Sequence, residues 1–277
     1  MGYFLKLFLR FAMPISLIFF ANCSSASSLE IYIKGLRSIE SGHYTKGMKL
    51  FQDAAELGDE KAAFAIGMLY DQGLGVKQDH AKAVKWYRKS ANQGFKKAQF
   101  NLALKYRNGN GVKKNDLVAA NWYRQAAEQG LMYAQYNLGL MYDDGDGVEE
   151  DKIEAAKWYK KAADQKFPRA QYKLGELYRT GKGVSKDLAK ALSLYKLASG
   201  GENRDAQFSL AYMYMSGTVV EKNLLLAHMW WNIAHSNGDE KSGPIRDALE
   251  REMTTADILK AKKMAIRCVD SEYENCS

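Results

Sequence analysis

Histidine and cysteine, on which many catalytic and metal sites depend, are scarce in this sequence. Its 277 residues include four histidines and three cysteines. His43 and His80 stand apart from the others. His228 and His235 would lie two turns apart on one helix, but no third metal ligand is placed beside them. Because the serines also lack a nucleophile-elbow context, we expect no metal, no cofactor and no enzyme activity.

The sequence also lacks a dense cluster of lysine and arginine. Its formal net charge is +8, and 47% of its residues are apolar while 26% are charged, as is ordinary for a globular protein. A mild basic excess favours anionic partners only weakly, so we expect no nucleic-acid partner.

The N-terminal apolar run, residues 11–20, is too short to cross a bilayer, which needs about 20 residues. Lys6 and Arg10 precede this run, and small residues follow it, with a small-x-small cleavage site at 24–26. We therefore expect residues 1–26 to be a secretory signal. The mature chain would then have no transmembrane span and would be periplasmic or secreted.

The three cysteines bear on the same question. Cys23 follows the apolar run as the acylated residue of a lipoprotein signal does, but the preceding residues 20–22 depart from the usual Leu-x-small pattern. Ordinary cleavage is the preferred prediction, and lipidation is the alternative. Cys268 and Cys276 are eight residues apart, which in an exported protein predicts a disulfide that staples the C-terminal end; two unpaired thiols are the alternative.

A period of 36 residues dominates the rest of the chain. An alanine, an aliphatic residue and a tyrosine recur in step at Ala62, Ile66 and Tyr70; Ala98, Leu102 and Tyr106; Ala134, Leu138 and Tyr142; Ala170, Leu174 and Tyr178; and Ala206, Leu210 and Tyr214. Glycine and valine columns follow, and a tryptophan column holds Trp86, Trp122, Trp158 and Trp230, with Leu194 in the fourth unit. The sequence therefore predicts five tandem repeats over residues 61–241.

Within one unit the spacing indicates two helices. Ala98, Leu102 and Tyr106 lie on one face of a first helix, and the glycines of 109–111 stop it. Asn115, like Asp79, Asp151 and Asp187 in other units, is placed to accept hydrogen bonds at the start of the second helix. Since one helix pair cannot bury its apolar stripe alone, the pairs must stack.

Divergent segments flank the repeats. Ile31–Ser41 and Tyr44–Leu57 predict a helix pair that caps the stack within residues 27–60. A last helix that ends near Cys268 would close the other end, within residues 242–277.

Three segments of the third repeat, together with Ala162 and Ala163, resemble the Sel1-like repeat family, a longer-looped relative of the tetratricopeptide repeat. These segments are AQYNLG at 134–139, YDDGDGV at 142–148 and AAKWY at 155–159. The resemblance covers residues 61–241, and the segment after Ala227 resembles the usual closing segment of bacterial members. The departures are Leu194 for tryptophan, Lys166 for glycine, and Thr218-Val219 in the loop of the fifth repeat.

This resemblance implies an all-α fold, a right-handed α-solenoid of antiparallel helix pairs with a concave surface that binds ligands. It also implies adaptor functions, such as signalling scaffolds, envelope assembly factors and secreted proteins that engage host molecules. Some cysteine-rich relatives with one disulfide per repeat are linked to penicillin binding or hydrolysis. No cysteine lies inside these repeats, so that chemistry is not expected here.

The side of the first helix opposite to Ala98 and Leu102 carries Phe100, Leu104 and Arg107, and in a helix-pair solenoid this side lines the concave groove. The position of Phe100 is aromatic in every repeat, in what we call the aromatic column: Phe64, Phe100, Tyr136, Tyr172 and Phe208. These rings either bind a peptide, a glycan or an extended protein segment, or pack against the preceding second helix.

Seven residues after the aromatic column, on the same helix, the residues alternate in charge: Asp71, Arg107, Asp143 and Arg179, followed by Met215. This row would select a charged, extended ligand, or it is a series of surface ion pairs that contribute little.

We therefore expect a non-enzymatic, exported bacterial scaffold that binds a protein or peptide partner through the aromatic column, Leu104, Arg107, Asp143 and Arg179. The alternative is a glycan- or peptidoglycan-binding protein or an envelope hydrolase, which would need acidic residues converging in the groove.

Overall fold

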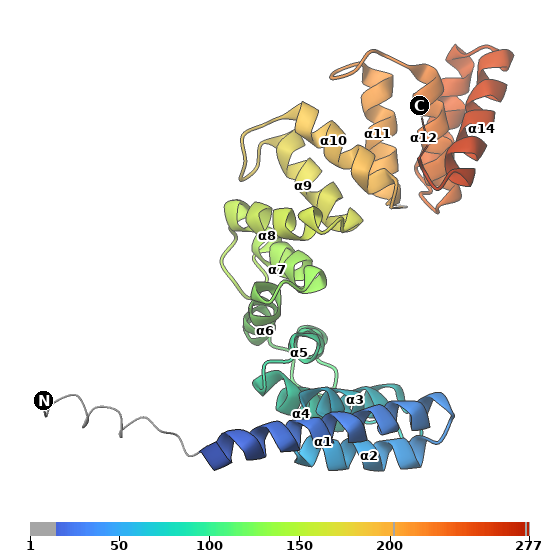
Figure 1. Cartoon of the computed structure of the whole chain (residues 1–277). Helices are drawn as coiled ribbons and strands as arrows, with labels where there is room; N and C mark the ends of the chain where they lie inside the picture. The colour runs from blue at the N-terminus through green and yellow to red at the C-terminus, as the bar shows by residue number, and fades with distance from the viewer. Residues whose placement is uncertain (1–14, 202, 275, 277) are drawn as a thin grey trace, which may run out of the picture. The chain divides into compact units, whose positions relative to one another are not determined.

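The computed structural model describes residues 15–201, 203–274 and 276, with side chains from residue 27 onward. All regular structure in this part of the chain is helical, with fourteen α-helices and one short 3-10 helix (Figure 1). The chain divides into two compact units between Gln129 and Gly130. The predicted all-α fold of paired helices is therefore confirmed.

Three helix pairs form the first unit. Its helices are α1 (Ile15–Glu40), α2 (Tyr44–Glu56), α3 (Glu60–Gln72), α4 (His80–Asn92), α5 (Lys96–Asn108) and α6 (Asp116–Glu128). Within this unit α1 packs on α2, α3 on α4 and α5 on α6, while α2 contacts α3 and α4 contacts α5. A helix pair, α1 and α2, lies ahead of the repeats, but α1 begins at Ile15 and not at Ile31 as expected.

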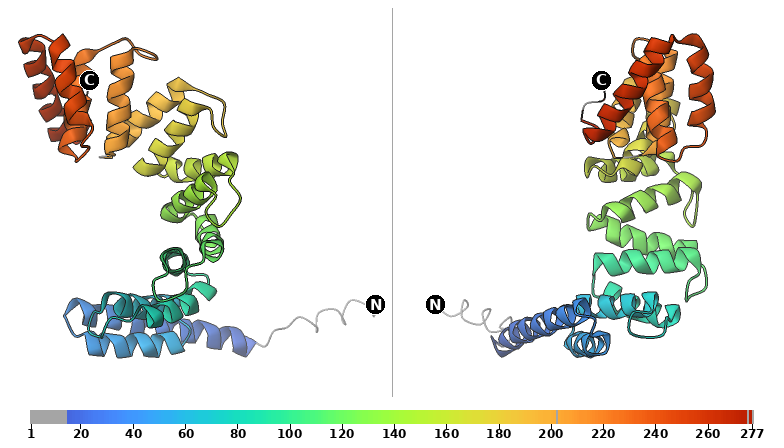
Figure 2. Two further views of the ribbon diagram at one scale, coloured as in Figure 1. Left: turned by 180° about the vertical axis from the view of Figure 1, so that it is seen from behind. Right: turned by 90° about the vertical axis from the view of Figure 1, so that its right-hand side faces the viewer.

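The second unit continues the pattern and ends in a different arrangement. Its helices are α7 (Met132–Asp144), α8 (Lys152–Asp164), α9 (Pro168–Thr180), α10 (Leu188–Ser199), α11 (Arg204–Ser216), α12 (Leu224–Ser236), α13 (Ser242–Leu249), η1 (Glu250–Glu252) and α14 (Thr255–Asp270). Helix α12 packs against both α11 and α14 (Figures 1 and 2). Helix α14 thereby covers the apolar side that α12 would otherwise expose.

Side-chain caps and glycine turns set the helix ends, as the sequence predicts. The side chain of Asp79 accepts a hydrogen bond from the backbone N–H of Lys82 at 2.9 Å, and Asn115 accepts one from Val118 at 3.0 Å. Gly109 ends α5 in the left-handed conformation, with φ of 71°. Lys166, which replaces glycine, adopts the same region with φ of 61°. The backbone turn is therefore kept where the sequence departs from the pattern.

A close contact within several repeats joins an aromatic ring of the second helix to a glycine of the first. Tyr87, Tyr123, Tyr159 and Tyr195 of the second helices are all buried. A Cβ atom added to Gly139 would lie 2.7 Å from the ring of Tyr159. The small residue therefore lets the two helices approach with the ring between them.

A buried polar group ties the C-terminal helices together. His228 of α12 is fully buried, and its Nε2 lies 2.9 Å from Oε1 of Glu250 in η1. Lys262 of α14 reaches the same carboxylate at 3.0 Å. At the end of α14, Cys268 is paired with Cys276, with a Cα–Cα distance of 4.6 Å.

The predicted signal peptide lies partly outside the described residues, which exclude 1–14. Helix α1 runs through the predicted cleavage site after Ala26. Among the helices that the structure describes, none combines the length and the apolar character needed to span a membrane.

Replacement of Gly139 by alanine should destabilise the second unit. Overpacking of a close contact costs about 1–3 kcal/mol, which exceeds the gain of about 1 kcal/mol in helix propensity. We expect the free energy of unfolding, measured with denaturant, to fall by about 1–2 kcal/mol. Gly200→Ala is the control, because Gly200 has a right-handed backbone and its nearest neighbouring atoms are 3.7 Å from an added Cβ. A Gly139→Ala variant as stable as the wild type would contradict the packing account.

Stability should fall as the pH drops below about 6.5, because burial lowers the pKa of His228 below this ordinary value. The hydrogen bond and the charge of Glu250 favour its protonation, but burial outweighs them, and Lys262 and Arg246 lower the pKa further. The unfolded chain therefore takes up this proton first. The pKa of Glu250 is lowered from 4.5 by His228 and Lys262, and its effect comes only at more acidic pH. Between about pH 7.5 and about pH 5.5, the free energy of unfolding should fall less for His228→Gln than for the wild type. Equal losses in the two proteins would show that His228 does not titrate as described.

Candidate functional site

The aromatic column is half-buried in every repeat. Each of its rings packs on an aromatic ring of the second helix in its own repeat. The centroid distances are 5.6 Å for Phe64–Tyr87, 5.7 Å for Phe100–Tyr123, 5.9 Å for Tyr136–Tyr159, 5.9 Å for Tyr172–Tyr195 and 6.3 Å for Phe208–Trp231. The packing alternative placed these rings against the preceding second helix, whereas their aromatic partners belong to the same repeat.

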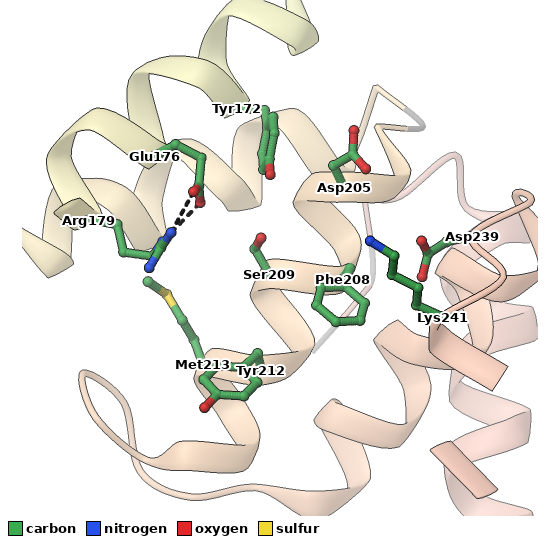
Figure 3. Close-up of a pocket in the computed structure, with 10 residues that line it drawn as sticks. All are labelled: Tyr172, Glu176, Arg179, Asp205, Phe208, Ser209, Tyr212, Met213, Asp239 and Lys241. Atoms are coloured by element: carbon green, nitrogen blue, oxygen red, sulfur yellow. Dashed lines mark hydrogen bonds and ion pairs between the residues drawn. The ribbon is translucent and has the colours of Figure 1, made fainter. Parts of the chain in front are cut away.

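In the second unit the other sides of three column rings line two neighbouring pockets. The first, which we call the apolar pocket, has a volume of about 410 Å³ (Figure 3). Its lining residues are Tyr172, Glu176, Arg179, Asp205, Phe208, Ser209, Tyr212, Met213, Asp239 and Lys241. Helices α9 and α11 provide most of this lining, and the segment after α12 provides Asp239 and Lys241. Tyr212 is 55% exposed, so an aromatic surface is open to a ligand.

The second pocket, which we call the basic pocket, has a volume of about 530 Å³. It is lined by Tyr136, Arg169, Tyr172, Lys173, Asn203, Arg204 and Asp205. Three of these residues are cationic and one is acidic. The two pockets share Tyr172 and Asp205, so they form one continuous surface of the second unit, which we call the α9–α11 groove.

An ion pair forms the edge of the apolar pocket. Arg179 donates hydrogen bonds to Glu176 from Nε at 3.0 Å and from Nη2 at 2.6 Å (Figure 3). The hydroxyl of Tyr195 donates to the same carboxylate. Burial alone would raise the pKa of Glu176, but the hydrogen bonds from Arg179 and Tyr195 outweigh it and lower the pKa. Glu176 is therefore a fixed negative charge with its partners already in place.

The hydroxyl of Tyr172 is neutral at physiological pH. Burial, together with the carboxylates of Glu176 and Asp205, raises the pKa of Tyr172 to about 12. This residue therefore offers a ligand an aromatic ring and a hydroxyl that can donate or accept a hydrogen bond.

The acidic residues of the alternating row have partners within their own unit. Asp71 binds Lys105, His80 at 2.6 Å and the Tyr87 hydroxyl at 3.3 Å. Burial would raise the pKa of Asp71, but the hydrogen bonds from Lys105 and His80 lower it overall. These contacts favour the interpretation of the row as ion pairs.

The equivalent acid of the third repeat, Asp143, accepts a hydrogen bond from the Tyr159 hydroxyl at 3.1 Å. It also lies 2.9 Å from Lys152 and 4.0 Å from Lys173. Asp143 therefore joins the second-helix tyrosine to a lysine of the basic pocket.

The structure does not bring all the predicted site residues together. Tyr136, Tyr172, Phe208 and Arg179 line the two pockets. Four others belong to the first unit, where all are half-buried: Phe64, Phe100, Leu104 and Arg107. A binding role for these four stays a prediction.

Several pocket residues were missed in the sequence. Arg169, Lys173 and Glu176 follow one another at helical spacing beside Tyr172, so a helical projection of α9 could have found them. Asp239 and Lys241 lie between α12 and α13, at the end of the last repeat, and the sequence analysis did not single them out.

The part of the chain that the structure describes contains no group of three or more histidine, cysteine or acidic side chains arranged to hold a metal ion. The candidate site is thus a surface groove of aromatic, apolar and charged side chains.

Comparison with known families gives a match to the Sel1 repeat. Its model matches six segments, at residues 30–59, 60–95, 96–131, 133–167, 168–200 and 204–239. The first of these is the helix pair that the sequence analysis treats as a divergent cap, so the match contains one unit more than the five expected. No curated protein matches the chain.

Two solved structures are similar over most of the chain. One is c5321, described as a protective antigen present in uropathogenic Escherichia coli strains and displaying an SLR fold, with a TM-score of 0.79 and 28% identity over 87% of this chain. The match covers 54% of that protein, so the present chain spans about half of its length. The other is a Sel1 repeat protein from Oxalobacter formigenes, with a TM-score of 0.71, 34% identity, and coverage of 76% of this chain and 84% of that one.

Proposed function

Because the chain belongs to the Sel1 repeat family, whose members generally serve as protein-interaction scaffolds, we propose that it binds an extended segment of a partner protein in the α9–α11 groove. The role is that of a scaffold without catalysis. The partner would contact the open sides of the aromatic column in the second unit.

One observation carries this proposal: two pockets of different chemistry meet at Tyr172 and Asp205. Aromatic and arginine side chains are enriched at protein interfaces, and Tyr212 and Arg169 bring both types to this surface, while the buried Met213 contributes to the lining of the apolar pocket. Volumes of about 410 and 530 Å³ are large enough to admit side chains of a ligand.

We also propose that the protein is exported, with residues 1–26 removed and Cys268 bonded to Cys276. The charged and apolar layout of the N-terminal segment supports export. The pairing of the two cysteines in the structure agrees with an oxidising compartment. The description of the E. coli relative as a protective antigen is also consistent with this location.

The intact mass of the protein recovered from the periplasm or medium of a producing bacterium tests this export. We expect a chain that begins at Ser27 and is lighter by two hydrogen atoms than its reduced form. A Cys276→Ser variant is the control and should show no such difference on reduction. A chain that begins at an acylated Cys23 would establish the lipoprotein alternative, and retention of residues 1–26 would refute export by cleavage.

Binding in the groove can be tested by affinity capture from the envelope fraction of the source bacterium. We expect a protein that is retained by the wild type and lost in Tyr172→Ala/Phe208→Ala, because both substitutions remove rings from the groove. Tyr212→Ala should weaken capture without loss of core packing, since its side chain is 55% exposed. The matched control is Leu197→Ala, which truncates a side chain that is 61% exposed and lines neither pocket.

Equal capture by the wild type and by the groove variants would contradict the proposed site. If the wild type retained peptidoglycan fragments and the Tyr172→Ala/Phe208→Ala variant lost them, the ligand of the groove would be a glycan and not a protein.

A further inference from the structure

The charges lining the basic pocket are unevenly balanced. Arg169, Lys173 and Arg204 face a single acidic residue, Asp205. These cations come from α9 and α11, so two neighbouring repeats contribute to one positive site. Such a site attracts an anionic group.

Two of the three cations are already partly positioned. Nη1 of Arg204 donates a hydrogen bond to the carbonyl oxygen of Gly238 at 3.0 Å. Lys173 is half-buried and lies 4.0 Å from Asp143, a long separation for an ion pair. Each cation therefore has capacity for a further acceptor, and an arginine fork matches the planar geometry of a carboxylate.

The apolar pocket, on the other side of Tyr172, suits a different kind of ligand group. Phe208, Tyr212 and Met213 form its apolar surface. Its charged groups are largely occupied, since Glu176 pairs with Arg179 and Asp239 accepts hydrogen bonds from the backbone and hydroxyl of Ser242. A bulky apolar side chain would displace water here without breaking these pairs.

We propose that the groove recognises an extended peptide segment in which an aspartate or glutamate is separated by one or two residues from an aromatic or long aliphatic residue. The carboxylate binds among Arg169, Lys173 and Arg204, and the apolar side chain enters the apolar pocket. The short separation follows from the two pockets sharing Tyr172 and Asp205. This proposal rests on the proposed function, because it specifies the ligand of the same groove.

A small anion alone would not use this surface fully. Single exposed ion pairs contribute little, so the carboxylate supplies orientation and selectivity while the apolar side chain supplies most of the binding. A peptide carries both groups on one backbone at a fixed spacing.

Selection from a displayed library of random dodecapeptides on the full-length mature protein tests the proposal. We expect the enriched sequences to contain an acidic residue one or two positions from phenylalanine, tyrosine, tryptophan, leucine or methionine. One enriched peptide, fluorescently labelled, should then bind about tenfold or more weakly to Lys173→Glu/Arg204→Glu than to the wild type. Added salt should weaken wild-type binding more than binding to this variant.

The matched control is Lys182→Glu/Lys186→Glu, which reverses two exposed charges in the same unit outside both pockets. In a buffer whose salt screens the change in net charge, its affinity for the peptide should be within about twofold of that of the wild type. A second control is the selected peptide with its acidic residue changed to asparagine or glutamine, which should lose affinity for the wild type but little for Lys173→Glu/Arg204→Glu.

The outcomes separate this inference from the proposed function. Enriched peptides without an acidic residue, or with equal affinity for the wild type and Lys173→Glu/Arg204→Glu, would overturn the inference. Groove binding would still stand if Tyr212→Ala abolished their binding. If no peptide were enriched, peptide recognition itself would fail, and both proposals with it.

Discussion

In four of the helix pairs an aromatic ring of the second helix lies against a glycine of the first, and the remaining architecture depends on this contact. Tyr159 on Gly139 is one example, with no space for a Cβ atom between them. The ring fills the volume that joins the two helices, while its hydroxyl reaches Asp143 on the first helix. Apolar packing and one hydrogen bond thus fix the same residue, so the pair has one preferred arrangement.

The groove is a consequence of this contact. Each ring of the aromatic column rests on a second-helix aromatic residue on one side, so it is held in place and is still partly exposed. In the second unit the open sides of Tyr136, Tyr172 and Phe208 become pocket walls. The core therefore positions the rings, while variable neighbours such as Lys173 and Asp205 give each pocket its charge.

The sequence predicted the features that repeat and missed those that do not. The caps at Asp79 and Asn115 and the turn at Gly109 follow from local hydrogen bonding and backbone geometry, which a period of 36 residues makes visible. The aromatic column was found for the same reason, although the sequence did not indicate that the second helix of the same repeat supports its rings. Asp239 and Lys241 enter the apolar pocket from a segment between helices, where only tertiary packing decides which side chains meet.

Binding in the α9–α11 groove can be measured by hydrogen exchange of the full-length mature protein, with and without a saturating bound ligand of the groove. We expect slower backbone exchange in α9, in the first turns of α11 and in residues 239–241, with little change in α14. Protection confined to α14 or to the first unit, with α9 and α11 unchanged, would contradict binding in this groove.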